Sequence, residues 1–132
     1  MQDVKNQHAE HINNTMKTIL LVEDDAIISE LLTQMIIQET PYKVFSVSDG
    51  LEALNLVKNI KPQLLILDYW LPFMQGIEVY DLLHNKEGLE EVPAIMLSVD
   101  APMREINKRH MTYIRKPFDM TKLLDTIHGL LV

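Results

Sequence analysis

Short apolar runs alternate along this chain with longer segments whose apolar residues recur every three or four positions. Five of the short runs have the length of β-strands, and most are apolar throughout rather than at every second position. Strands of this kind are buried on both faces, which is typical of a parallel sheet covered by helices. The predicted strands span residues 18–23, 43–47, 64–68, 94–98 and 111–115.

The segments between these runs have the period of amphipathic helices. The longest, residues 26–39, is preceded by Asp25, a favourable N-cap, and is ended by Thr40-Pro41. Five strand–helix units predict an α/β fold whose right-handed crossovers bring the carboxyl ends of all strands to one edge, where ligands bind. The other predicted helices lie at residues 51–57 and 77–84, weakly within 102–110, and from Met120 onward behind the N-cap Asp119.

Length and composition fit one globular domain of 132 residues. Residues 1–15 are polar without an apolar period, so we predict a flexible tail at 1–15 and a single domain at 16–132. The net charge of −7 argues against direct nucleic-acid binding. The chain has no cysteine and no apolar run of the roughly 20 residues that a membrane span needs, so we expect a cytoplasmic protein. We interpret His84, His110 and His128 as surface residues.

Chemically useful side chains collect at the carboxyl ends of four predicted strands. The first strand ends in Glu23 and Asp24, the third in Asp68 and the fourth in Ser98, and Lys116 follows the fifth. Three carboxylates side by side repel one another unless a cation lies among them. Hard oxygen ligands suit Mg²⁺, with Mn²⁺ as a substitute. The sequence therefore predicts a divalent-metal site at this edge.

One of these carboxylates is also a candidate nucleophile. Asp68 lies on a central strand flanked by the other groups, and an aspartate that attacks a phosphoryl group forms an aspartyl phosphate. Such a transfer needs the charge on the phosphoryl oxygens to be neutralised, which Mg²⁺, Lys116 and Ser98 would do. The same metal would be able to reach the backbone at Trp70.

Six motifs in the chain match one known family in order and separation. They are LLVEDD, SDGLEAL, LLILDYWLP, LPFMQGIE, IMLS and YIRKPF, and they extend over most of the chain. From about Lys17 to Val132 the sequence resembles the receiver domain of two-component response regulators, in the form of a stand-alone, chemotaxis-regulator-like receiver. Each motif alone is weak, and the ordered set is specific.

The resemblance implies a flavodoxin-like, doubly wound three-layer sandwich with strand order 2-1-3-4-5. It implies that Asp68 accepts a phosphoryl group from a sensor histidine kinase or a histidine phosphotransfer protein. Mg²⁺ would be held by Glu23, Asp24, Asp68 and the backbone carbonyl of Trp70. The protein would be a signalling phosphoacceptor that catalyses only its own phosphorylation and dephosphorylation.

The resemblance also implies how the signal leaves the site. Ser98 and Lys116 would contact the phosphoryl oxygens, and Tyr113 would turn inward when Ser98 moves toward the phosphate. A downstream protein partner would then bind the face formed by the last strand and its two flanking helices. The resemblance further implies a cis peptide bond between Lys116 and Pro117.

Three residues depart from the family pattern and leave the chemical groups intact. Val99 stands where a small residue is usual, Phe73 where glycine is common, and Trp70 is bulky beside the phosphoryl site. A branched side chain at position 99 would narrow access to Asp68. We expect these changes to affect rates and partner choice.

Three other function classes compete with this interpretation. A pseudo-receiver that binds proteins without phosphorylation would be expected to lack Asp68 or Lys116, and both are present. An Mg²⁺-dependent phosphatase of the haloacid dehalogenase type would carry its nucleophile in an Asp-x-Asp motif on the first strand, where this chain has Glu-Asp-Asp. A flavodoxin-like cofactor carrier would need a Gly- and Ser/Thr-rich phosphate loop after that strand, which the chain lacks.

Overall fold

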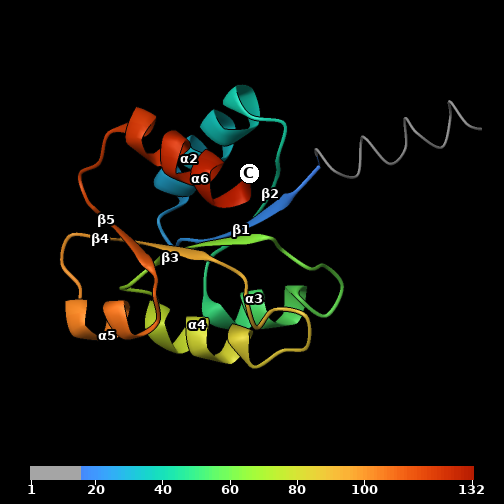
Figure 1. Cartoon of the computed structure of the whole chain (residues 1–132), viewed down its shortest axis with the longest axis vertical. Coiled ribbons are helices and arrows are strands. Elements are labelled where there is room, and N and C mark those ends of the chain that lie inside the picture. Colours follow the sequence, from blue (N-terminus) through green and yellow to red (C-terminus); the bar gives the residue numbers. More distant parts are fainter. Residues whose placement is uncertain (1–15) are drawn as a thin grey trace, which may run out of the picture.

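A computed structural model describes residues 16–132 as a five-stranded parallel sheet between two layers of helices (Figure 1). The sheet order is β2-β1-β3-β4-β5, which confirms the predicted flavodoxin-like topology. The predicted tail at residues 1–15 lies outside the described residues. The strands are β1 (Thr18–Val22), β2 (Lys43–Val47), β3 (Leu64–Asp68), β4 (Ala94–Ser98) and β5 (Thr112–Arg115). The helices are α2 (Ala26–Glu39), α3 (Gly50–Leu56), α4 (Gly76–His84), α5 (Met103–Lys108) and α6 (Met120–Leu131).

The sheet separates two hydrophobic cores because successive side chains of a strand face opposite layers. Ile19 and Leu21 of β1 pack with buried residues of α2 and α6. Leu20 and Val22 pack on the other face with buried residues of α3, α4 and α5. Figure 1 shows α2 and α6 on one side of the sheet and α3, α4 and α5 on the other. The central strands β1, β3 and β4 are almost wholly buried because both of their faces are covered, whereas the edge strands β2 and β5 keep exposed polar residues such as Lys43 and Arg115.

The helix starts follow the predicted capping residues. The Asp25 carboxylate accepts hydrogen bonds from the backbone N–H groups of Ile27 and Ile28 at 2.9 and 3.1 Å. The Asp119 carboxylate accepts one from the N–H of Thr121 at 2.7 Å. Such caps satisfy donors that have no partner inside the helix. Both predicted N-caps are therefore confirmed.

The strand ends differ from the prediction by one residue at two places. β1 ends at Val22, so Glu23 lies just beyond it, and β5 begins at Thr112. The weak helix predicted within residues 102–110 is the six-residue α5. Its Ile106 is fully buried, whereas Met103 is 43% exposed, so only Ile106 belongs to the core. Within residues 16–132, no helix is both apolar enough and long enough to cross a bilayer.

The interpretation of His84 as a surface residue is wrong. Its ring stacks on Tyr80 with centroids 3.7 Å apart, and its two ring nitrogens lie 2.8 and 2.7 Å from the carbonyl oxygens of Tyr80 and Val92. The side chain is therefore half-buried between the end of α4 and the chain that leads to β4. His110 and His128 are exposed, as predicted.

Phe73 occupies the loop between β3 and α4 with a backbone φ of 72°. This left-handed conformation costs a residue with a Cβ about 1–2 kcal/mol and suits glycine. The Phe73 side chain is 82% exposed, so no burial in the described residues offsets that cost. The backbone conformation explains why glycine is the common residue at this position in the family that the sequence resembles.

Candidate functional site

The carboxyl ends of β1, β3, β4 and β5 bring the predicted site residues to one edge of the sheet. In the parallel register Val22 pairs with Leu67, so Glu23 follows β1 beside Asp68 at the end of β3. Ser98 closes β4 opposite Arg115 of β5, and Lys116 comes next. Chain connectivity and strand register, rather than any loop excursion, therefore place these groups together.

Three carboxylates form a compact cluster at this edge. One oxygen each from Glu23, Asp24 and Asp68 can be chosen so that all three lie within 4.8 Å of one another. Glu23 and Asp68 are buried, at 3% and 8% exposure, while Asp24 is exposed. Carboxylate oxygens at this spacing fit a hard divalent cation such as Mg²⁺, which binds few protein carboxylates and retains water ligands.

Lys116 forms ion pairs with both buried carboxylates. Its Nζ donates hydrogen bonds to Glu23 Oε1 and Asp68 Oδ2, both at 3.1 Å. Burial lowers the pKa of Lys116, but hydrogen bonds to Asp68 and Glu23 outweigh it, so the pKa lies above its ordinary value. The Lys116 N–H donates to the Ser98 carbonyl at 2.9 Å, and the Lys116–Pro117 peptide is cis, as predicted.

Burial raises the pKa of Glu23, and the charge on Asp68 raises it further. The backbone N–H of Asp25 opposes this rise by donating to Glu23 Oε2 at 3.1 Å. A carboxylate that binds its proton more tightly than usual also binds a cation less well as the pH falls. The raised pKa of Glu23 therefore makes cation binding at this site sensitive to a fall in pH.

The backbone around Asp68 is tightly packed. Asp68 Oδ1 accepts a hydrogen bond from the Trp70 N–H at 3.0 Å, and the Gly76 N–H donates to the Tyr69 carbonyl at 2.8 Å. A Cβ at Gly76 would lie 2.3 Å from the carbonyl oxygen of Asp68. The loop from β3 to α4 returns so close to Asp68 that only glycine fits at position 76 without a backbone shift.

Ser98 and Tyr113 are adjacent, and among residues 16–132 neither side chain forms a hydrogen bond with the carboxylate cluster. Ser98 is 1% exposed, and its hydroxyl donates to the Asp100 carbonyl at 2.5 Å. The Tyr113 hydroxyl donates to the carbonyls of Ser98 and Val99 at 3.0 and 3.3 Å. The predicted switch residues thus hold the segment that follows β4. Asp100 was missed by sequence reasoning, although a polar residue two positions beyond the end of β4 was an available signal.

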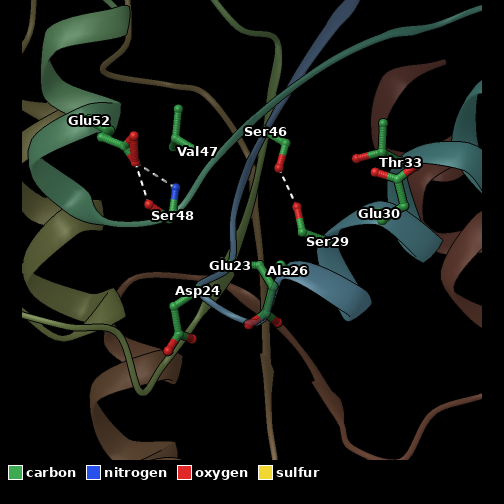
Figure 2. Close-up of a pocket in the computed structure, with 10 residues that line it drawn as sticks. All are labelled: Glu23, Asp24, Ala26, Ser29, Glu30, Thr33, Ser46, Val47, Ser48 and Glu52. Carbon is green, nitrogen blue, oxygen red and sulfur yellow. Dashed lines mark hydrogen bonds between the residues drawn. The ribbon is translucent and has the colours of Figure 1, made fainter.

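An open cavity of about 360 Å³ lies beside the cluster, between α2 and the chain that follows β2 (Figure 2). Glu23 and Asp24 form one end of its lining, and Figure 2 shows the hydroxyl-rich remainder. Glu52 accepts hydrogen bonds from the N–H and hydroxyl of Ser48 at 2.9 and 2.5 Å. The cavity gives solvent access to the Glu23 and Asp24 side of the cluster, which a hydrated cation requires. Its other lining residues are Ala26, Ser29, Glu30, Thr33, Ser46 and Val47.

Solved structures share this fold across most of the chain. The chemotaxis response regulator CheY4 of Vibrio cholerae is 25% identical with a TM-score of 0.79, covering 88% of this chain and 99% of that one. A CheY-like response regulator receiver domain protein from Methanospirillum hungatei is 28% identical with a TM-score of 0.80, covering 88% and 94%. The three-layer architecture is therefore that of known receivers.

Sequence comparison leads to the same family. The polar-differentiation response regulator DivK of Brucella anthropi is 28% identical over 119 residues, 87% of this chain and 96% of the relative. The probable transcriptional regulator ycf29 of Pyropia yezoensis is 30% identical over 117 residues; the match covers 86% of this chain but only 52% of that relative. The family model described as the response regulator receiver domain matches residues 19–128. The chain belongs to the response regulator receiver domain family.

Proposed function

We propose that Asp68 is the phosphoacceptor of a two-component phosphorelay. The observation that carries this proposal is the convergence of Lys116 Nζ, 3.1 Å from Asp68 Oδ2, with three carboxylates whose oxygens lie within 4.8 Å. A nucleophilic carboxylate, a cation-binding cluster and a fixed ammonium group are the parts that phosphoryl transfer needs. Receiver domains are signalling modules rather than conventional enzymes.

The transfer begins with a phosphohistidine presented by a sensor histidine kinase or a histidine phosphotransfer protein. A carboxylate oxygen of Asp68 attacks phosphorus, a P–O bond forms, and the P–N bond breaks with its electron pair going to the imidazole. Water later attacks the acyl phosphate, which releases inorganic phosphate and restores the carboxylate. The chain thus catalyses only its own phosphorylation and dephosphorylation.

The chain's own groups would stabilise the charge on the phosphoryl oxygens. Lys116 is already within hydrogen-bond distance of Asp68, so it reaches a phosphoryl oxygen attached there without crossing the site. Glu23, Asp24, Asp68 and the backbone carbonyl of Trp70 would hold Mg²⁺ or Mn²⁺. The bound cation would supply neutralising positive charge to the phosphoryl group.

The output would depend on Ser98 and Tyr113. The Ser98 hydroxyl would give up its hydrogen bond to the Asp100 carbonyl and donate to a phosphoryl oxygen instead. Tyr113, which is hydrogen-bonded to the same segment, would follow this movement. The face of α5, β5 and α6 would then present a changed surface to a downstream protein. We place this exchange in the cytoplasm, with residues 16–132 as the receiver unit.

Intact-mass measurement with Mg²⁺ and acetyl phosphate tests the proposal. We expect one phosphoryl adduct on the wild type, none on Asp68→Asn, and loss of the adduct with EDTA. Asp125→Asn, which removes an exposed carboxylate on α6, is the matched control and should retain the adduct. A wild type without adduct would indicate a pseudo-receiver, and turnover of a small phosphomonoester would indicate a phosphatase.

A further inference from the structure

The segment from Ser98 to Pro102, which joins β4 to α5, is held in place by hydrogen bonds from two directions. The Ser98 hydroxyl donates to the Asp100 carbonyl within the segment. The Tyr113 hydroxyl donates to the Ser98 and Val99 carbonyls from β5. A Ser98 hydroxyl committed to Asp100 is not free to bind a phosphoryl group. A contact that fixes the position of Asp100 therefore influences whether the Ser98 hydroxyl is available to the site.

The Trp70 side chain also contacts this segment, at Asp100. Its indole Nε1 donates to Asp100 Oδ1 at 3.3 Å, and its ring meets Tyr69 edge to face with centroids 4.7 Å apart. The side chain is 57% exposed, so these two contacts, rather than burial, fix its orientation. Trp70 and Asp100 lie on the wall of a hollow of about 170 Å³ that Ala101 and Pro102 complete.

Trp70 also contacts the phosphoacceptor directly through its backbone. Its N–H donates to Asp68 Oδ1 at 3.0 Å. One residue therefore joins the phosphoacceptor, through its main chain, to Asp100, through its side chain. Asp100 in turn accepts a hydrogen bond from the indole at its carboxylate and one from the Ser98 hydroxyl at its backbone carbonyl. The contacts form a continuous chain from Asp68 to the hydroxyl that would bind the phosphoryl group.

We propose that Trp70 is a positioning residue that latches the Ser98–Pro102 segment in its resting arrangement through Asp100. The inference rests on the proposed function, because it concerns the movement of Ser98 toward a phosphoryl group on Asp68. For that movement the Ser98–Asp100 hydrogen bond must break. An Asp100 anchored by the indole keeps its carbonyl in place and favours the unbroken bond. The latch thus opposes the phosphorylated arrangement.

Beryllofluoride is a stable analogue of the phosphoryl group. Its affinity for the Mg²⁺-loaded protein, measured by calorimetry, shows how strongly the latch opposes the phosphorylated arrangement. Trp70→Phe keeps an aromatic ring but loses the N–H donor, and Asp100→Ala loses the acceptor. Each should bind beryllofluoride about three-fold more tightly, the effect of one net hydrogen bond at the surface. The double variant should gain no more than either single variant, because both remove the same contact.

Asp100→Asn separates the hydrogen bond from the charge. Its side-chain carbonyl still accepts the indole N–H, so its beryllofluoride affinity should stay near that of the wild type. Amide hydrogen exchange of residues 98–101 should accelerate in Trp70→Phe and Asp100→Ala but not in Asp100→Asn. This second readout does not depend on binding, and the Asp100 pair carries the test if Trp70→Phe does not fold.

The outcomes separate the latch from the function on which it rests. If the wild type binds beryllofluoride, two results overturn the latch alone. One is an unchanged affinity in Asp100→Ala, and the other is independent gains in affinity that add in the double variant. An Asp100→Asn protein that binds as tightly as Asp100→Ala does the same, because the loss of charge would then explain the gain. A wild type that binds no beryllofluoride overturns the proposed function and the latch with it.

Discussion

Replacing Lys116 by methionine removes the ammonium group that separates two nearly buried carboxylates. Its Nζ lies 3.1 Å from Glu23 Oε1 and 3.1 Å from Asp68 Oδ2. The carboxylate side chains are 2% exposed for Glu23 and 10% for Asp68, so water screens them poorly. Methionine keeps most of the length and the apolar stem of lysine, and the charge is therefore the main change.

The size of the effect follows from the spacing of the charges. The carboxylate oxygens of the cluster lie within 4.8 Å of one another. Two unit charges at that separation repel by about 3 kcal/mol at an effective dielectric constant of about 20. Removing one partner of a buried ion pair commonly costs about 3–5 kcal/mol. Because Lys116 is 18% exposed and a carboxylate can bind a proton, we expect a loss of about 3 kcal/mol in unfolding free energy.

Urea unfolding at neutral pH, with EDTA and with saturating Mg²⁺, measures this loss. Mg²⁺ should restore much of it, since a cation bound by the same carboxylates again neutralises them. The matched control is Lys122→Met on α6, because Lys122 is exposed and forms no ion pair among residues 16–132. The reasoning is refuted if Lys116→Met is as stable as Lys122→Met in EDTA, or if Mg²⁺ leaves the difference unchanged.

Three further predictions follow from contacts elsewhere in and around the site. Gly76→Ala places a Cβ 2.3 Å from the carbonyl oxygen of Asp68 and should cost about 1–3 kcal/mol in urea unfolding. Gly129→Ala in α6, with open space around it, should instead stabilise the protein by about 0.5–1 kcal/mol, and equal effects would contradict the packing argument. Burial raises the pKa of Glu23, so this carboxylate takes up its proton at a higher pH than an ordinary glutamate. The rise in melting temperature caused by Mg²⁺ should therefore shrink as the pH falls and be restored as the pH rises through that pKa. A rise that is independent of pH between neutrality and about pH 4 would contradict this role of Glu23. Hydrogen bonds from Arg109 lower the pKa of Asp81, so the ion pair stabilises the fold above the unfolded-state pKa of about 3.9 and loses this effect as the pH falls through the folded-state pKa. The Asp81 side chain is 49% exposed, so Asp81→Asn should cost only about 0.5–1 kcal/mol at neutral pH and nothing in strong acid, and a cost that persists in acid would argue against the ion pair.

The sequence predicted the elements that buried apolar residues define. β3, β4 and the helix α2 have the predicted bounds, because a continuous apolar run or a helical period ends where the chain leaves the core. The edge strand β2 also has the predicted bounds, although none of its residues is fully buried. β1 and β5 differ by one residue, since Glu23 and Met111 continue the run without continuing the strand. Glu23 is buried at the site although it lies outside β1, so it resembles a strand residue in burial but not in backbone pairing.

The positions of the site residues were also predictable, because parallel strands share a carboxyl edge whatever their loops do. The sequence did not predict what these side chains contact in the resting protein. The bond from Ser98 to Asp100, and that from Trp70 to Asp100, depend on the path of two loops. His84 was misjudged for the same reason, since the carbonyl of Val92 that faces its ring lies in the loop between α4 and β4, whose path the sequence does not define.

The most direct test of the account is a crystal structure of the protein with Mn²⁺ and beryllofluoride, with manganese located by its anomalous scattering. We predict one manganese ion bound by Asp24, Asp68 and the carbonyl of Trp70, with Glu23 bound directly or through water. We also predict beryllium on a carboxylate oxygen of Asp68, with Lys116 and Ser98 as donors to the fluorines. Manganese elsewhere, or beryllofluoride remote from Asp68, would contradict it.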